Sequence, residues 1–243
     1  MKKLRLDKFL ADLGFGTRKE VRKLIKQKRV SVNGEIVNNP SFHIDPENDA
    51  VFLDGEPLTY RKNHYFMLNK PPGYVTAKED RNYPAVMELL SDLPYLKKLF
   101  PVGRLDIDTE GLLIITDDGQ LGHRIAHPKW EIEKEYIAVV KGDPSDLNTD
   151  RFEKEGLKLK DYQTKPFKLE ILETGKEESK VKITVKEGKY HIVKRIMEEL
   201  GHPVIHLKRT RIGPVALDES LSPGEYRELT EEEVKSLKES VNL

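Results

Sequence analysis

The feature that most constrains the fold is the order of the apolar segments after residue 64. Segments with strand-like composition outnumber the helical ones and comprise residues 65–68, 112–116, 136–140, 167–172 and 181–185. The best helical pattern there is residues 191–200, and the acid-rich segment TEEEVKSLKE predicts a capped helix. Because strands and helices do not alternate regularly, the pattern predicts an α+β fold and not a doubly wound parallel sheet. We expect a mixed, mainly antiparallel β-sheet with flanking helices.

The first thirty residues predict two short helices. Apolar residues at positions 6, 9, 10 and 13 share one helical face, and Gly14 is suited to end that helix. Thr17 and Glu20 then fit a capping box, in which each side chain satisfies a free backbone N–H group at the start of the second helix. The apolar positions 21, 24 and 25 bury one side of that helix, which leaves its Lys and Arg side chains largely outward.

Two hairpins are expected before residue 60. Asn33 and Gly34 separate the apolar segments 30–32 and 35–37, and this dipeptide favours the positive φ angles of a type I′ turn. Residues 50–53, followed by Asp54 and Gly55, suggest a second hairpin. Residues 58–64 have no clear period and are interpreted as a linker. We therefore predict a small domain over residues 1–60 and a larger one over residues 61–243.

Charge is distributed unevenly along the chain. The formal net charge is zero, yet the first 29 residues hold eleven Lys and Arg residues against three acids. Such a segment is either a solvated helix face or a surface for a polyanion such as RNA. The chain has no cysteine, which excludes disulfides and thiolate chemistry, and it has no apolar run of about 18 residues. The charged start also lacks a signal-peptide pattern, so we expect a cytoplasmic protein.

The first domain resembles the α-L RNA-binding domain first recognised in a small-subunit ribosomal protein. The segments RLDKFL, GTRKEVRKLI and VSVNG match it in order. The resemblance implies RNA contacts by the basic residues of both helices and by the capped start of the second, namely Arg5, Lys8, Thr17, Arg18, Lys19, Arg22 and Lys26. The physical argument agrees, because clustered cations and the N–H groups of a helix start attract phosphate whatever the base sequence.

The segment FPVGRLDIDTEGLLIITDDG, residues 100–119, is the best candidate for chemistry. Asp106 and Asp108 precede an apolar strand, where a carboxylate can be held rigidly. From spacing alone, an Asp-x-Asp pair is more often a turn or a surface pair. The Asp-Asp-Gly sequence at residues 117–119 is interpreted as a turn at the end of the strand.

This segment resembles the signature of the RsuA branch of pseudouridine synthases, as do the blocks KEY from residue 134, EGKYHIVKR from residue 187 and RTRIGPVALDESLSPGEYRELTEEE from residue 209. The resemblance implies that Asp106 is the nucleophile, that Tyr136 is the platform for the target base and that Lys194 is the cation beside Asp106. It implies that Arg104 enters or braces the RNA. One departure is Ile192, where the family usually carries glutamine, so a side-chain hydrogen bond expected there is in doubt.

The resemblance implies isomerisation of uridine to pseudouridine in ribosomal RNA, with small-subunit RNA favoured and large-subunit RNA open. This reaction consumes no cofactor, metal or water, and a carboxylate can carry it as a covalent nucleophile. The target base must leave its stack before it can react. The expected partner is ribosomal RNA or a partly assembled subunit, no membrane is expected, and a monomer is the default expectation.

Two alternatives belong to other functional classes. The sequence Asp-Ile-Asp-Thr at residues 106–109 also fits the motif of magnesium-dependent haloacid-dehalogenase-type phosphatases, but these place an apolar strand directly before the first Asp, where this chain has Pro-Val-Gly-Arg. A binding-only ribosome-assembly factor is the other. His123 and His127 have the spacing of a metal pair on a helix, yet no third ligand is evident, so no metal site is predicted.

Overall fold

The computed structural model describes residues 3–60, 63–93 and 95–243. Contacts divide the chain into two compact units. The N-terminal unit comprises Met1–His64 with Asp92–Lys98, and the C-terminal unit comprises Tyr65–Ser91 with Leu99–Leu243. Part of the expected linker, residues 61 and 62, and the basic residue Lys2 lie outside the described residues. In the described part of the chain, no helix combines the length and the apolar character needed to cross a membrane.

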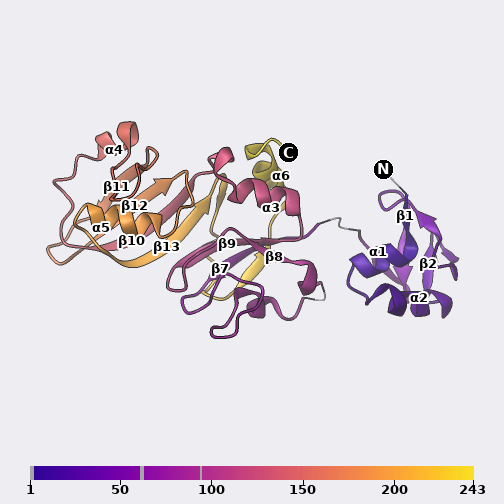
Figure 1. The fold of residues 1–243 in the computed structure, drawn as a ribbon. Helices are drawn as coiled ribbons and strands as arrows, with labels where there is room; N and C mark the ends of the chain where they lie inside the picture. Colours follow the sequence, from indigo (N-terminus) through magenta and orange to yellow (C-terminus); the bar gives the residue numbers. More distant parts are fainter. Residues whose placement is uncertain (1–2, 61–62, 94) are drawn as a thin grey trace. The chain divides into compact units, whose positions relative to one another are not determined.

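The N-terminal unit contains both predicted helices, α1 (Leu6–Asp12) and α2 (Arg18–Lys26) (Figure 1). Gly14 follows α1 with a φ of 87°, a left-handed conformation that glycine adopts readily. Thr17 is the N-cap of α2, and its hydroxyl and the Glu20 carboxylate form the reciprocal hydrogen bonds of the predicted capping box. These elements are therefore confirmed.

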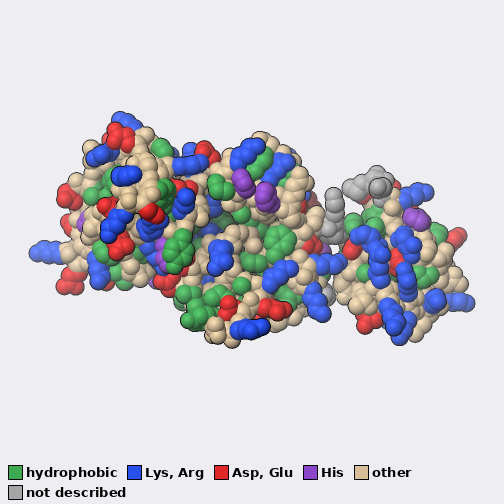
Figure 2. Space-filling model, in the orientation of Figure 1, with side chains coloured by type: hydrophobic (Ala, Val, Ile, Leu, Met, Phe, Trp, Pro, Cys, Tyr) green, Lys and Arg blue, Asp and Glu red, His purple; other side chains and the backbone are tan. Residues whose placement is uncertain are grey.

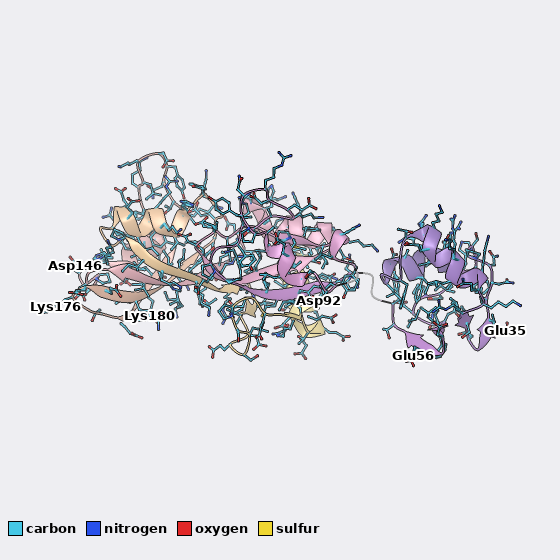
Figure 3. All side chains as sticks on the ribbon, turned by 90° about the horizontal axis from the view of Figure 1, so that it is seen from below. Glu35, Glu56, Asp92, Asp146, Lys176 and Lys180 are labelled. Carbon is cyan, nitrogen blue, oxygen red and sulfur yellow. The ribbon has the colours of Figure 1, made fainter. Side chains whose placement is uncertain are left out.

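Both predicted hairpins are present as well. A sheet of order β3-β2-β5-β6 is built from β2 (Val30–Val32), β3 (Glu35–Ile36), β5 (Val51–Leu53) and β6 (Glu56–Leu58). Asn33 and Gly34 turn the first hairpin with φ angles of 52° and 87°. The edge strands carry the acids Glu35 and Glu56, labelled in Figure 3, and charged residues discourage pairing of an exposed edge with another chain. A short ladder joins β1 (Leu4–Arg5) to β4 (His43–Ile44).

The described residues of the C-terminal unit form a nine-stranded sheet, with the main order β11-β12-β10-β13-β9-β7-β15. β14 pairs with β13 and β8 pairs with β9. The strands are β7 (Tyr65–Lys70), β8 (Phe100–Val102), β9 (Glu110–Thr116), β10 (Lys134–Lys141), β11 (Lys168–Glu173), β12 (Glu178–Val185), β13 (Val204–Ile212), β14 (Val215–Ala216) and β15 (Tyr226–Glu228). Only the β9–β13 pair is parallel among these ladders, so the predicted mixed, mainly antiparallel sheet is confirmed.

Helices cover the two halves of this sheet separately. The helix α5 (Ile192–Glu199) lies along the β10–β13 half, whereas α3 (Gly119–Ala126) and α6 (Glu231–Ser240) lie beside the β9 half (Figure 1). A short helix, α4 (Thr149–Glu155), contacts β11. The core of the β9 half joins Leu112 and Ile114 of β9 to Leu121 of α3 and Leu237 of α6, all fully buried. The expected helices at 191–200 and in TEEEVKSLKE are thus present.

The two halves meet where β9 and β13 run parallel. Gly111 of β9 is the register partner of Arg209 of β13. Gly111 has a φ of 99°, and a β-carbon there would lie 2.2 Å from the Arg209 carbonyl oxygen. Only glycine fits this close approach of two backbones. The junction positions the loop that precedes β9.

Candidate active site

Asp106 lies on the loop between β8 and β9, and hydrogen bonds fix this loop on both sides of it. On the N-terminal side, the Thr76 hydroxyl donates to the Leu105 carbonyl oxygen at 2.8 Å and accepts the Leu105 N–H at 3.1 Å. On the C-terminal side, the Gly73 N–H donates to the Ile107 carbonyl oxygen at 2.7 Å. The position of Asp106 is therefore fixed by hydrogen bonds to the backbone of its two chain neighbours.

A buried lysine adds the strongest brace. Lys70 at the end of β7 is fully buried, and its ammonium donates to the carbonyl oxygens of Pro71, Ile107 and Thr109 at 3.0, 3.3 and 2.8 Å. Burial lowers the pKa of Lys70 to about 8, although the nearby carboxylates of Asp108 and Asp106 oppose this change. Lys70 lies just beyond the predicted strand segment 65–68, and no sequence pattern indicated it as a site residue.

The structure brings Lys194 beside Asp106, as the resemblance implied. The Lys194 ammonium on α5 lies 3.3 Å from Asp106 Oδ2 and 2.7 Å from Asp108 Oδ1, so the two carboxylates share one cation. The Asp106 side chain is 27% exposed and the Asp108 side chain 66% exposed. Asp106 is thus the more enclosed acid, whereas Asp108 points toward solvent.

A second nitrogen base approaches Asp106 from the opposite oxygen. His191 Nε2 lies 3.4 Å from Asp106 Oδ1. His191 is the N-cap residue of α5 and has a φ of 51°, in the left-handed region that residues with a β-carbon seldom adopt. This backbone conformation turns the imidazole toward the nucleophile candidate. No sequence pattern indicated His191 as a site residue.

The charge cluster changes the pKa values of two of its members. Burial lowers the pKa of Lys194, but its hydrogen bond to Asp108 and the charge of Asp106 outweigh burial and leave that pKa raised. Burial likewise raises the pKa of Asp108, and the hydrogen bond from Lys194 reverses this, so the Asp108 pKa is lowered. Both groups are therefore ionised at neutral pH.

Asp106 lines a pocket of about 280 Å³. Tyr136 of β10 lines it and is 8% exposed, so its ring forms part of a wall and is not a surface group. Lys134 and Arg209 also line the pocket. Burial, together with the charge of Arg209, lowers the pKa of Lys134 to about 8. The pocket thus combines one carboxylate with an aromatic wall and several cations.

Arg209 is a further residue that sequence reasoning missed. It is 2% exposed, and its Nε donates to the Leu112 carbonyl oxygen at 2.8 Å. Within the described residues its Nη2 has no hydrogen-bond partner. This hydrogen bond joins the side chain of a β13 residue to the backbone of β9 beside the pocket that Arg209 lines.

Arg104, two residues before Asp106, lines the same pocket and is exposed. Ile192, the position of the family glutamine, is the first residue of α5, is buried and lines the pocket with its apolar side chain. Asp118 was expected in a simple turn, but it is the N-cap of α3 and its side chain accepts the Leu121 N–H at 3.1 Å.

The cations predicted to bind RNA in the N-terminal unit fall into two groups. Arg5 and Arg22 both donate to the fully buried carboxylate of Asp7, and Lys8 pairs with Asp12. Among the described residues, no carboxylate lies within ion-pair distance of the exposed side chains Arg18, Lys19 and Lys26. Figure 2 shows Lys and Arg side chains gathered on the visible face of this unit.

Comparison with known proteins identifies the family of this site. A family model described as RNA pseudouridylate synthase matches residues 64–199, and an S4 domain model matches residues 4–59. The chain belongs to the RNA pseudouridylate synthase family. An RNA pseudouridine synthase of Aquifex aeolicus is 44% identical over 98% of both chains. Ribosomal small subunit pseudouridine synthase A of Haemophilus influenzae is 45% identical and that of Escherichia coli 44% identical, each over 96% of this chain and at least 99% of the relative.

A solved structure gives the same result at the level of the fold. The crystal structure of a pseudouridylate synthase is 43% identical, with a TM-score of 0.66, and covers 96% of this chain and 99% of that one. The residues around Asp106 therefore belong to a pseudouridine synthase, and the phosphatase alternative loses its support. In this chain, β8 ends at Val102, so no strand leads directly into Asp106 as the phosphatase motif requires.

Proposed function

We propose that this protein isomerises a specific uridine of ribosomal RNA to pseudouridine, with Asp106 as the covalent nucleophile. The observation that carries the proposal is the position of Asp106, on a braced loop, 3.3 Å from the Lys194 ammonium and at the mouth of a pocket walled by Tyr136. In this setting the carboxylate has a cation on one side and an aromatic surface on which a uracil ring can rest.

The proposed reaction only rearranges the atoms of the uridine and consumes no cofactor, metal or water. Asp106 adds to the base or to the ribose C1′ of the flipped uridine, and the N1–C1′ bond breaks. The uracil turns within the pocket, a C5–C1′ bond forms, and the aspartate is released. The hydrogen on C5 leaves as a proton and N1 gains one, so that substrate and product are isomers and the enzyme is unchanged.

The remaining residues have supporting roles in this proposal. Tyr136, which lines the pocket, is the platform for the target base, and its phenol helps to move the C5 proton. Lys194 balances the negative charge of Asp106 within the pocket. Arg104 enters or braces the RNA near the position that the flipped uridine leaves, because a guanidinium suits phosphate and base contacts.

We also propose a division of labour between residues 1–60, as the RNA-binding domain, and residues 61–243, as the catalytic domain. The S4 match to residues 4–59 supports this boundary. Arg18, Lys19 and Lys26, with the capped start of α2 at Thr17, are the primary phosphate contacts, since these cations have no acidic partner among the described residues. Arg5, Lys8 and Arg22 add positive potential while they also bind Asp7 and Asp12.

The substrate that we propose is small-subunit ribosomal RNA, free or in a partly assembled subunit, and the enzyme acts as a cytoplasmic monomer. The names of the Haemophilus influenzae and Escherichia coli relatives support this choice, because both are small-subunit enzymes. Large-subunit RNA is the second candidate.

The test is tritium release from transcripts of bacterial small-subunit and large-subunit rRNA that carry 5-tritiated uridine. Loss of the C5 hydrogen as tritiated water reports pseudouridine formation directly. Release of about one tritium per molecule from small-subunit RNA alone supports the proposal. Release from large-subunit RNA alone would reassign the substrate, and tight binding of RNA without any release would favour the binding-only assembly factor.

A further inference from the structure

An exposed aromatic side chain lies at the rim of the active-site pocket. Tyr190 is 76% exposed, more than any other large hydrophobic side chain in the described part of the protein. Its two chain neighbours, Lys189 and His191, line the pocket that contains Asp106, whereas Tyr190 itself does not. A tyrosine left in water at this place offers a flat aromatic surface for a partner.

The ring of Tyr190 is held in place by stacking. Its centroid lies 3.6 Å from that of the His191 ring, with 20° between the planes. His191 in turn lies 3.4 Å from Asp106 and keeps a left-handed backbone conformation. One face of the tyrosine therefore rests on a residue that contacts the nucleophile candidate, and its high exposure leaves the other face open to solvent. An ordered ring loses little freedom when a planar ligand stacks on it.

The charges around Tyr190 suit a nucleotide. Lys189 precedes it, with its ammonium 5.0 Å from the centre of the Tyr162 ring, and Arg195 also lies over that ring. Two acids of the same region are already paired, since Asp108 binds Lys194 and Asp161 binds Arg195. A phosphate bound at this rim would thus meet the ammonium of Lys189, the chain neighbour of Tyr190.

We propose that Tyr190 is a stacking site for an unpaired nucleobase of the RNA, adjacent in the RNA chain to the uridine that enters the pocket. The inference rests on the proposed function, since flipping one uridine unstacks its neighbours and exposes their faces. Tyr190 replaces the lost stacking partner. Because the ring is at the rim and stacks on His191, the neighbouring base is held at a fixed place relative to Asp106.

The experiment compares Tyr190→Ala, Tyr190→Phe and the matched control Tyr83→Ala in the tritium-release assay on small-subunit rRNA. Tyr83 is also exposed, at 55%, and does not line the pocket. Stacking of one base contributes enough to predict a rise in KM on the order of tenfold for Tyr190→Ala. We expect a kcat within about twofold of wild type, as for loss of binding that is uniform between ground and transition states. Tyr190→Phe keeps the ring and should retain the wild-type KM, as should Tyr83→Ala.

A second comparison shows whether a base is the ligand. Short RNAs that contain the modified uridine are made with an abasic nucleotide at one flanking position at a time. On the RNA that lacks the stacked base, wild type and Tyr190→Ala should have equal KM values. An unchanged KM for Tyr190→Ala on intact RNA would overturn the proposal, and so would an equal KM penalty on every abasic RNA.

Failure of the stacking site and failure of the proposed function give different results. The Tyr190→Trp variant places an indole on His191, and its fluorescence is compared with that of the wild type, whose single tryptophan is Trp130. Quenching by RNA that is specific to this variant supports stacking even if no tritium is released, in which case the proposed isomerase function alone falls. Tritium release by wild type without such quenching would retain the function and overturn the stacking site.

Discussion

Lys70 gives the most demanding prediction, because its replacement by methionine removes a buried charge and three hydrogen bonds together. Hydrogen bonds from a charged donor contribute about 1.5–3 kcal/mol each, so the contacts with Pro71, Ile107 and Thr109 are worth about 5–9 kcal/mol. The lowered pKa of the ammonium corresponds to a net cost of about 3 kcal/mol for holding its charge in this site, because nearby carboxylates offset only part of the cost of burial, and methionine avoids this net cost. Lys70→Met should therefore destabilise the protein by about 4 kcal/mol.

The assay combines thermal unfolding with tritium release. A change of this size lowers Tm by about 8–16 °C in a chain of this length. The loop of Asp106 loses its brace, and a small displacement of a reacting group reduces kcat by about 100-fold. Lys134→Met is the matched stability control. Lys134 has a pKa lowered to about 8 as well, but within the described residues its ammonium donates one hydrogen bond, to the Ile132 carbonyl oxygen at 3.0 Å, so loss of the bond and relief from burial nearly cancel.

The pH dependence follows from the direction of the Lys70 shift. Because its folded-state pKa is about 8 and lies below the unfolded value, the unfolded chain binds more protons between pH 8 and about 10.4. The free energy of unfolding of the wild type should rise with pH in this window relative to that of Lys70→Met. A Lys70→Met variant with wild-type Tm and kcat, or a stability difference that is flat from pH 8 to 10, would refute the reasoning.

Three other predictions concern different parts of the molecule. Gly111→Ala should lower Tm by several degrees and reduce activity, since the added β-carbon would lie 2.2 Å from the Arg209 carbonyl oxygen. The control is Gly119→Ala at the start of α3, where the added β-carbon meets open space, so Tm should be unchanged or slightly raised. Lys194→Gln should reduce kcat by about 100-fold with little effect on Tm. The pKa of the Asp108 carboxyl group, followed by NMR, should rise in this variant. An unchanged kcat would show that the Lys194 charge does not contribute to the reaction. Replacing Arg18, Lys19 and Lys26 together by Ala should reduce the slope of the logarithm of the RNA-binding constant against the logarithm of the salt concentration by about 2–3. The control replaces three exposed lysines of the C-terminal unit by Ala and should leave the slope unchanged. These are Lys154, Lys168 and Lys176, the last labelled in Figure 3.

Local signals predicted much of the fold correctly. The capping box at Thr17 and the Asn33-Gly34 turn are specified by side chains within four residues, so no tertiary information was needed. The strand β13 was missed because Arg209 occupies an inward position where an apolar residue is expected. The helix α3 was missed because it is short and contains two glycines, which weakens its pattern.

The site was predicted in part, and the reason for each omission is physical. Asp106 and Lys194 lie 88 positions apart in the sequence, and the resemblance to a family, not periodicity, indicated that they meet. Lys70 was missed because lysine is almost never fully buried, so a sequence pattern places it at the surface. His191 was missed because its contact with Asp106 depends on a left-handed backbone conformation that no local motif indicated.

The measurement that tests the central claim most directly is tritium release by Asp106→Asn, with Asp108→Asn as the matched control and RNA binding measured for both. The two acids share the Lys194 ammonium and lie two residues apart, so both variants disturb the same charge cluster. If Asp106 is the nucleophile, Asp106→Asn binds RNA but releases no tritium, and Asp108→Asn stays within about tenfold of wild type. Tritium release by Asp106→Asn at the wild-type rate would contradict the account.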